Sequence, residues 1–154
     1  MNRLRSEKLT DPELKSLIEG VAADLNSNEA IQFSVKRAGS ERTLQGHVVD
    51  EIFCITREAL TNAFRYADAS KIEVELNYDK REFRMSCRDN GRGFDLQAFH
   101  ANGMNSHWGL RGMAERAEKI GAKFSCDSSL GKGADVRVIV PARNAYVRRH
   151  GFFL

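Results

Sequence analysis

The sequence predicts one domain of the α/β (α+β) class, because segments with strand periodicity alternate with segments of helical periodicity. The strongest helical pattern lies in residues 48–69, where apolar side chains recur at steps of three and four. The strongest strand patterns are residues 72–76 and 83–87, two alternating runs joined by a turn at 78–80. At 154 residues, the chain is long enough to bury a core of its own.

The remaining elements follow from capping residues, helix-stop residues and further alternating runs. Pro12 and Glu13 mark the first turn of a helix that begins after Thr10 or Asp11. Gly121 is the expected end of another helix. The expected order is a helix at 11–25, a strand at 31–35, a turn at 38–42, the long helix ending near 68–70, strands at 72–76 and 83–87, a helix at 113–120, and strands at 124–126 and 136–140.

Composition and charge argue against several classes of protein. The net charge of +3 is small, which argues against a dedicated nucleic-acid binder. Cys54, Cys87 and Cys126 lie far apart in apolar segments, as is typical of buried thiols in a reducing compartment. No apolar run approaches the ~20 residues of a membrane span, and the first residues lack the apolar core of a signal peptide. We therefore expect a cytoplasmic fragment that makes no membrane contact.

The long helix carries a row of polar residues beside its apolar stripe. Glu58, Asn62, Arg65 and Tyr66 stand at i, i+4, i+7 and i+8. At roughly 100° per residue, they share about a quarter to a third of the helix circumference. A ligand would explain such a polar wall next to the core. The alternative, equally supported by this helix alone, is an exposed polar pair and a solvated arginine.

The second strand of the hairpin points to Asp89. A period of two puts this carboxylate on the same buried face as Phe83, Met85 and Cys87. Because an unpartnered buried carboxylate costs several kcal/mol, the position calls for a partner. The alternative is a strand that ends one residue early, which leaves Asp89 as a turn residue before Asn90-Gly91.

Glycines follow at two places where a backbone could approach a ligand. Gly91 and Gly93 allow positive φ and remove Cβ atoms from a contact surface. Gly109 and Gly112 precede the helix at 113–120, and free amides at a helix start attract anions. The polar segment between these pairs, residues 95–106, is a candidate lid. The alternative for the second pair is that its glycines only shape a loop.

Three motifs in order now carry a family resemblance: REALTNAFRYADA (57–69), DNGRGF (89–94) and HWGLRGMAERA (107–117). They resemble the N box and the two glycine boxes of the GHKL ATPase superfamily. The residues of these three motifs are most similar to those of the catalytic ATP-binding domain of bacterial sensor histidine kinases of the NarL-partner type. The resemblance covers residues 45–141 and implies the Bergerat fold, a two-layer sandwich with a mixed five-stranded sheet covered on one face by about three helices.

The resemblance also implies domain limits. Residues 1–10 would be an N-terminal extension, residues 11–141 the ATP-binding catalytic domain, and residues 142–154 a basic C-terminal tail.

Roles for individual residues follow from the same resemblance. Asp89 would accept a hydrogen bond from the adenine amino group, and Asn62 would ligate Mg²⁺. Glu58 would orient or polarise a group near that metal. The other expected contacts with ATP are Arg65 to phosphate, Tyr66 along the nucleotide, Gly91 and Gly93 at the adenine and ribose edge, Gly109, Leu110, Arg111 and Gly112 around the phosphates, and the flanking motif residues Phe94 and Met113.

The partners expected of such a kinase lie outside this chain. A sensor kinase needs a phosphoacceptor histidine followed by an acidic residue, and none of the four histidines fits. We therefore expect a separate histidine-bearing dimerisation domain and a response regulator. The fragment alone should bind ATP and Mg²⁺ without autophosphorylation.

One departure from the family pattern leaves other functions open. The family usually places Thr after the last Gly-x-Gly, where its hydroxyl helps to hold a water beside the adenine-binding Asp, whereas Ala134 follows Gly133 here. A water or a serine would have to compensate. The alternatives within the superfamily are an anti-sigma factor serine kinase and a nucleotide-binding module without catalysis.

Overall fold

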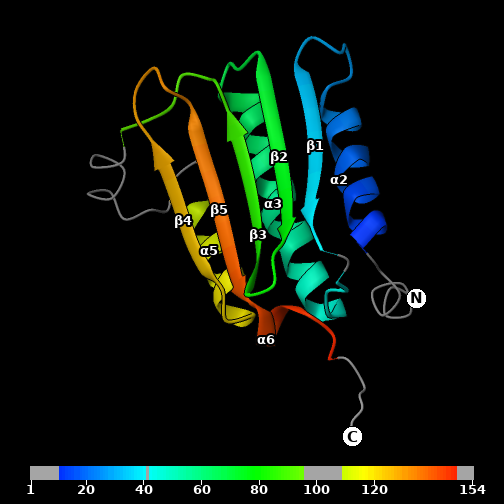
Figure 1. Ribbon diagram of the computed structural model, residues 1–154. Helices are drawn as coiled ribbons and strands as arrows, with labels where there is room; N and C mark the ends of the chain where they lie inside the picture. Colours follow the sequence, from blue (N-terminus) through cyan, green and yellow to red (C-terminus); the bar gives the residue numbers. More distant parts are fainter. Residues whose placement is uncertain (1–10, 41, 96–108, 149–154) are drawn as a thin grey trace, which may run out of the picture.

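The computed structural model describes residues 11–40, 42–95 and 109–148, which form one sheet and a layer of helices (Figure 1). The helices are α2 (Asp11–Leu25), α3 (Gly46–Tyr66), α5 (Leu110–Lys119) and the short α6 (Ala142–Ala145). The strands are β1 (Gln32–Gly39), β2 (Lys71–Tyr78), β3 (Glu82–Asp89), β4 (Lys123–Ser128) and β5 (Ala134–Pro141).

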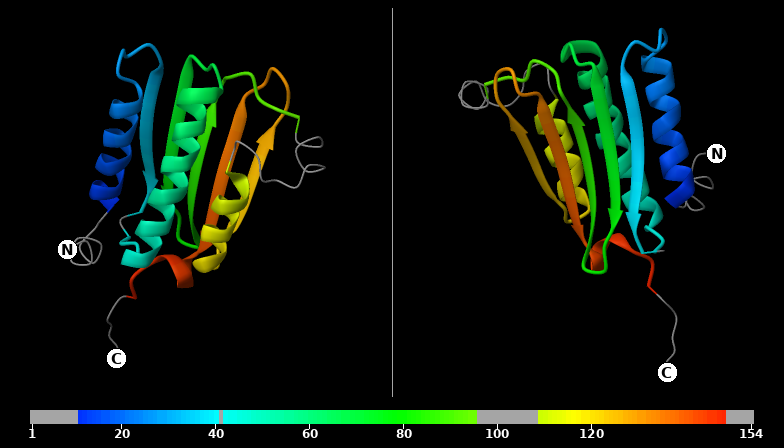
Figure 2. Two further views of the ribbon diagram at one scale, coloured as in Figure 1. Left: turned by 180° about the vertical axis from the view of Figure 1, so that it is seen from behind. Right: turned by 45° about the horizontal axis from the view of Figure 1, so that its top comes forward.

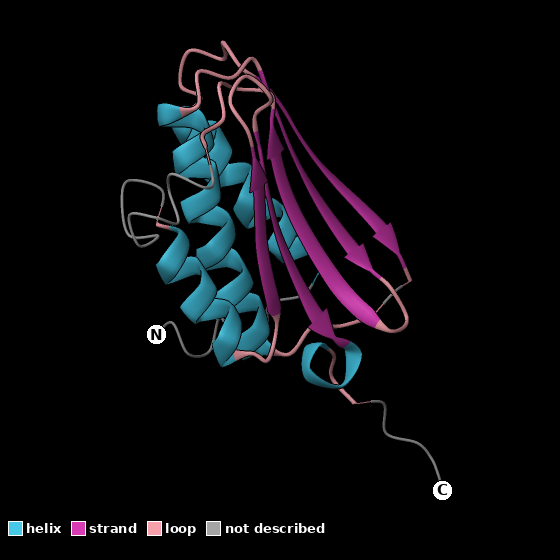
Figure 3. Cartoon of the chain, turned by 90° about the vertical axis from the view of Figure 1, so that its left-hand side faces the viewer, coloured by secondary structure: helices cyan, strands magenta, loops and turns pink. Residues whose placement is uncertain are grey.

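The sheet has five strands in the order β1-β2-β3-β5-β4. β1 and β2 run parallel, and every other neighbouring pair is antiparallel, so the sheet is mixed. Helices α2, α3 and α5 lie against one face, which gives two layers in side view (Figures 2 and 3). The expected fold class, a two-layer sandwich with a mixed five-stranded sheet and three covering helices, is confirmed.

The core lies between the helix layer and the sheet. On the helix side, Ile52, Ile55 and Leu60 of α3 are fully buried, and Val74 and Met85 meet them from the sheet. Burying one such side chain stabilises the fold by about 1.5–3 kcal/mol. Strand alternation therefore fixes which face of β2 and β3 meets the helices, as the sequence predicted.

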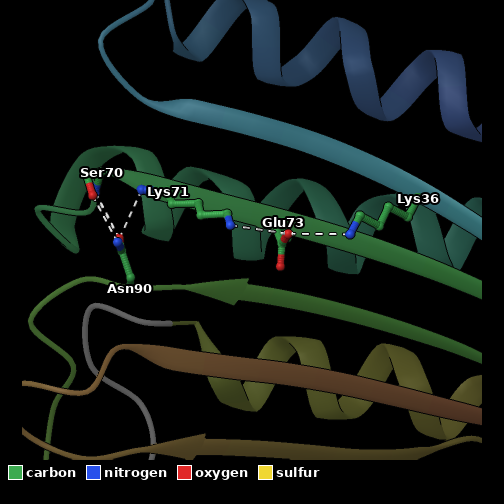
Figure 4. Close-up of polar contacts among 5 residues, drawn as sticks. All are labelled: Lys36, Ser70, Lys71, Glu73 and Asn90. Carbon is green, nitrogen blue, oxygen red and sulfur yellow. Dashed lines mark hydrogen bonds and ion pairs between the residues drawn. The ribbon is translucent and has the colours of Figure 1, made fainter.

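The uncovered face of the sheet carries charged and polar side chains. Glu73 of β2 lies between Lys36 of β1 and Lys71, with N–O distances of 3.9 and 3.8 Å (Figure 4). Exposed pairs of this kind contribute little to stability. The second face therefore faces water and leaves the helix-covered face to hold the core.

Two element ends differ from the sequence prediction. Helix α3 ends at Tyr66 rather than near 68–70, because Ala67 caps it and Asp68 takes a φ of +56°. A residue with positive φ cannot continue a right-handed helix. Strand β1 continues to Gly39, into the segment expected to turn, because it keeps pairing with β2 as far as Tyr78.

Residues 142–148, expected to begin a basic tail, instead pack on the domain. Ala145 and Tyr146 are buried, and Tyr146 pairs with Leu44 in an isolated β-bridge. The Tyr146 hydroxyl donates to the Asp79 carbonyl at 2.8 Å. These contacts place the described end of the chain within the folded unit.

In the segments that the structure describes, no helix combines the length and apolar character needed to cross a membrane.

Candidate functional site

Asp89 is the last residue of β3 and points into the helix-covered side of the sheet. Its neighbours across the sheet are Ile72 on β2 and Ala134 on β5. Only 8% of its surface is exposed. The placement predicted from strand periodicity is thus confirmed, and the alternative of an early strand end is wrong.

The surroundings of Asp89 set its proton affinity. Burial raises the pKa of the Asp89 carboxyl, and the charge of Asp135 adds to the rise. Backbone hydrogen bonds from Gly91 and Ala134 act in the opposite direction, and the Gly91 N–H lies 2.8 Å from Oδ1. A carboxylate with a raised pKa, held by backbone donors in a buried position, is a typical feature of a binding site.

A small pocket separates Asp89 from helix α3. Asn62, with only 5% of its surface exposed, is the polar residue that α3 contributes to it. The lining residues are Ala59, Asn62, Ala63, Cys87, Asp89, Phe94, Leu110, Cys126, Ala134 and Val136. The free space is about 10 Å³, enough for about one water molecule, so a larger ligand needs its walls to move.

The two thiols of this pocket contribute apolar surface. Burial raises the pKa of Cys126 to about 12 and that of Cys87 further still. Both stay protonated at neutral pH and behave as small hydrophobic side chains, as predicted from the apolar segments that carry them.

A second hollow of about 240 Å³ lies further along α3, against the start of α5. Glu58 lines it from α3, and Gly109, Gly112 and Met113 line it from the start of α5. Glu58 and Asn62 are one helical turn apart, so the two hollows follow one another along the same helix. The structure thereby brings the N box and the second glycine box together.

Three of the predicted site residues stand apart from both hollows. Arg65 and Tyr66 are exposed at the end of α3, and Tyr66 has 46% of its surface exposed. Arg111 extends into solvent and pairs with Glu115 of its own helix at 3.6 Å. The polar wall expected on α3 therefore divides, with Asn62 buried and Arg65 and Tyr66 solvated.

The first pair of glycines is explained by packing against the protein's own backbone. A Cβ on Gly91 would collide with the Ala67 carbonyl at the end of α3. Gly93 has a φ of +65°, and a Cβ there would collide with the Ser129 carbonyl. Positive φ is thus confirmed for Gly93 and is not found at Gly91.

The second pair behaves differently. Gly109 caps α5 with a φ of +62°, and a Cβ on it would lie 2.7 Å from Glu58 Oε2. Gly112 has open space where its Cβ would be. Only Gly109 is therefore required by the local structure.

Asn90 is a structural residue that the sequence reading treated only as part of a turn. Its Oδ1 accepts hydrogen bonds from the Ser70 and Lys71 amides at 2.9 Å, and its Nδ2 donates to Ser70 Oγ at 2.9 Å (Figure 4). These bonds tie the end of β3 to the start of β2. An Asp-Asn-Gly run at a strand end is the signal that could have indicated this role.

Ser128 anchors the other side of the glycine loop. Its hydroxyl accepts from the Phe94 amide at 2.9 Å and donates to the Gly133 carbonyl at 2.8 Å. Ser128 pairs with Ala134 across the sheet, and Ala134 stands where the family usually has a threonine. Ser128 is therefore the serine placed to compensate for the threonine hydroxyl. Because its proton is already donated, it cannot also donate to a water beside Asp89.

The expected lid, residues 95–106, lies outside the described residues except for Asp95. Within the described ranges, no group of three or more His, Cys, Asp and Glu side chains is arranged to hold a metal ion.

Comparison with known proteins agrees with this geometry. Residues 47–144 match the model of the family described as "Histidine kinase-, DNA gyrase B-, and HSP90-like ATPase". Among solved structures, the histidine kinase domain of the Erythrobacter litoralis EL346 blue-light activated histidine kinase is similar, with a TM-score of 0.63 and 20% identity over 84% of this chain and 61% of that one. At this identity the likeness concerns the fold.

Two curated relatives are sensor proteins. The sensor histidine kinase LiaS of Bacillus subtilis is 40% identical over 94 residues, which are 61% of this chain and 25% of LiaS. The sensor protein VraS of Staphylococcus saprophyticus is 29% identical over 138 residues, which are 90% of this chain and 38% of VraS. The chain thus spans well under half the length of these relatives. Since the family model covers more than half of the chain and the fold agrees, the chain belongs to the family of histidine kinase-, DNA gyrase B- and HSP90-like ATPases.

Proposed function

We propose that this chain is the ATP-binding catalytic domain of a two-component sensor histidine kinase. It would transfer the γ-phosphoryl group of ATP to a histidine on a dimerisation domain outside this chain, from which a response regulator would receive it. The observation that carries the proposal is Asp89, a buried carboxylate facing a pocket beside Asn62.

The adenine end of the site would be the Asp89 pocket. The Asp89 carboxylate would accept a hydrogen bond from the adenine amino group, which provides the partner that a buried acceptor requires. Apolar side chains such as Phe94 and Val136 would pack against the base. Leu110, expected around the phosphates, lines this pocket instead and would also pack against the base. Because the present pocket is smaller than a purine, Phe94 and Leu110 would have to move outward when the nucleotide enters.

The phosphate end would be the hollow between α3 and α5. The chain of phosphates would run from Asn62 toward Gly109 and Gly112, at the start of α5, where the amides of the first helical turn have no partner within the helix. Glu58 would orient a group next to the reacting phosphate. Arg65, Tyr66 and Arg111 would have to turn toward the nucleotide to make the contacts expected of them.

A magnesium ion fits the residues at this end. The Asn62 carbonyl oxygen is a ligand type that Mg²⁺ accepts, and phosphate oxygens and waters usually complete its shell. When bound, the ion would neutralise phosphate charge. Positioning by Asn62 and Glu58 would then be the main contribution of this chain to phosphoryl transfer.

Calorimetric titration with ATP, with and without Mg²⁺, tests nucleotide binding. Mixing the chain with a histidine-bearing dimerisation segment and radiolabelled ATP then tests transfer. An acid-labile phosphate on that segment is the expected product. Phosphorylation of a small antagonist protein on serine by this chain alone would instead favour an anti-sigma factor kinase.

Ala134 gives one specific reason to keep a non-catalytic nucleotide-binding module as the second candidate. Ala134 lies directly across from Asp89 and offers no hydroxyl, and the Ser128 proton is donated elsewhere. Tight ATP binding without any phosphohistidine in the mixed assay would favour this second function.

A further inference from the structure

Three positively charged side chains from three separate segments line one hollow of about 510 Å³. Arg42 follows β1, Lys80 lies in the turn between β2 and β3, and Arg148 follows α6, with Ser40 completing the lining. We infer that this hollow, called the basic hollow below, binds a phosphate group. It lies near α6, whereas β3 ends in Asp89 at the opposite end of the sheet (Figure 1).

The position of Arg42 is fixed by the ring of Tyr146. The Arg42 guanidinium lies 4.2 Å from the ring centroid. That ring is buried, and its hydroxyl donates to the Asp79 carbonyl at 2.8 Å. A guanidinium stacked on a fixed ring keeps the N–H groups at its edge for an anion and loses little freedom on binding.

Backbone hydrogen bonds bring the other two cations close to Arg42. The Val147 amide donates to the Thr43 carbonyl at 2.8 Å, which holds the residue before Arg148 against the residue after Arg42. In the hairpin turn, the Asp79 amide donates to the Glu82 carbonyl at 3.0 Å and so fixes the base of the loop that carries Lys80. Three folded segments thus converge here, each with one cation.

The charges of the basic hollow are not balanced by the described residues. None of its described lining residues is acidic, and Arg42, Lys80 and Arg148 form no ion pair within the part of the chain that the structure describes. Like charges that are brought together repel one another, and each of them is attracted to an anion bound between them.

A phosphate group fits this arrangement better than a carboxylate does. It carries a charge of about −1.5 to −2 at neutral pH and three strong acceptor oxygens. Arginine forks bind such oxygens in pairs, and lysine adds a point charge. Free inorganic phosphate offers this charge and these oxygens. The phosphodiester in the headgroup of an anionic phospholipid offers the same kind of acceptor oxygen with a single negative charge, and the test separates these two sources.

The test uses the complete 154-residue chain in low salt. Inorganic phosphate is titrated while the backbone amide signals of residues 42, 80 and 148 are followed by NMR. In parallel, the chain is sedimented with phosphatidylglycerol vesicles and with neutral phosphatidylcholine vesicles. The site variant is R42Q/K80Q/R148Q, and the control of equal charge is K15Q/K36Q/R84Q, which removes exposed cations outside the basic hollow.

We expect one or both phosphate sources to bind the native chain and the control equally, and the site variant at least about tenfold more weakly. Signal changes with inorganic phosphate identify free phosphate as a ligand, and selective sedimentation with phosphatidylglycerol identifies the lipid. The inference is overturned if the native chain binds neither source, or if the site variant binds as well as the control. The NMR signals are local to residues 42, 80 and 148, and sedimentation is judged by the difference between the site variant and the control of equal charge. Neither readout therefore depends on nucleotide binding at Asp89.

Discussion

The two ends of the proposed nucleotide site are built in different ways. At the adenine end, Asp89 and Asn62 are buried between sheet and helix, and backbone amides hold the carboxylate. At the phosphate end, Glu58 is exposed and Gly109 begins a helix after a segment outside the described residues. In the proposed site, base recognition would thus rest on the folded core, whereas phosphate binding would rest on surface groups of two different helices. Changes at the adenine end should therefore act on affinity for the base, and changes at the phosphate end on metal-dependent steps.

The largest effect is expected from D89N. The amide puts an NH₂ group where the adenine amino group needs an acceptor, so ATP should bind about 30- to 100-fold more weakly, the equivalent of about 2–3 kcal/mol. Isothermal titration calorimetry measures this loss. The control is D127N, which changes an exposed carboxylate on β4. Equal affinities for D89N and the native chain would remove Asp89 from base recognition.

Two glycine substitutions compare how tightly the backbone is packed at the two ends of the proposed site. In G91A the new methyl group meets the Ala67 carbonyl, so the free energy of unfolding should fall by about 2–3 kcal/mol. In G112A the methyl group enters open space within α5, and helix propensity should stabilise the fold by up to about 1 kcal/mol. Urea unfolding of both variants measures the difference, and similar stabilities would contradict the packing described for Gly91.

Asn62 connects the two ends, and its substitution should affect the metal more than the base. In N62A, the gain in ATP affinity on adding Mg²⁺ should shrink by about tenfold, while affinity without Mg²⁺ stays close to native. Titrations in Mg²⁺ and in EDTA give both values. A native-like gain from Mg²⁺ in N62A would exclude Asn62 as a ligand.

The pH dependence of stability should reflect the buried carboxylate. Because burial raises the pKa of Asp89 in the folded chain above its ordinary value, the folded chain binds this proton more tightly than the unfolded chain. The contribution of Asp89 to stability is therefore greatest at a pH below the pKa of Asp89 in the unfolded chain, and it is lost as the pH rises through the pKa of Asp89 in the folded chain. D89N lacks this loss, so its melting temperature should exceed the native one at pH 7 and approach it near pH 4. A D89N melting temperature below the native value at pH 7 would contradict the account.

The smallest effect is expected from A134T. A threonine hydroxyl beside Asp89 would supply the donor that Ser128 gives to Gly133, and β-branched residues suit a strand. ATP affinity should rise by about three- to tenfold, the equivalent of about one hydrogen bond. Calorimetry of A134T against A134S and the native chain measures the gain, and weaker binding by both variants would show that alanine suits this pocket.

Much of the adenine end could be predicted from the sequence because strand periodicity is a local rule. Asp89 falls in phase with Phe83, Met85 and Cys87, so its face follows from counting residues. The geometry of the phosphate end cannot be predicted by counting residues in this way. The distances from Glu58 to Gly109 depend on how α3 and α5 pack, and the exposure of Arg65 and Tyr66 depends on where α3 ends.

Other features could not be predicted because they arise from long-range contacts. The role of Gly91 follows from its distance to Ala67, which lies in another element. The packing of Tyr146 depends on the carbonyl groups of Asp79 and Glu82, which flank the turn between β2 and β3, whereas residues 142–154 were expected only to form a basic tail. Contacts between segments that are distant in the sequence thus decided both cases.

The most direct test of the account compares ATP and GTP in one titration series with Mg²⁺. Adenine offers an amino donor where guanine offers a carbonyl acceptor, and a buried carboxylate accepts the first and repels the second. We predict that ATP binds at least about 30-fold more tightly than GTP and that D89N abolishes this preference. Equal binding of both nucleotides, or a preference that survives in D89N, would contradict the assignment of Asp89 to the adenine base.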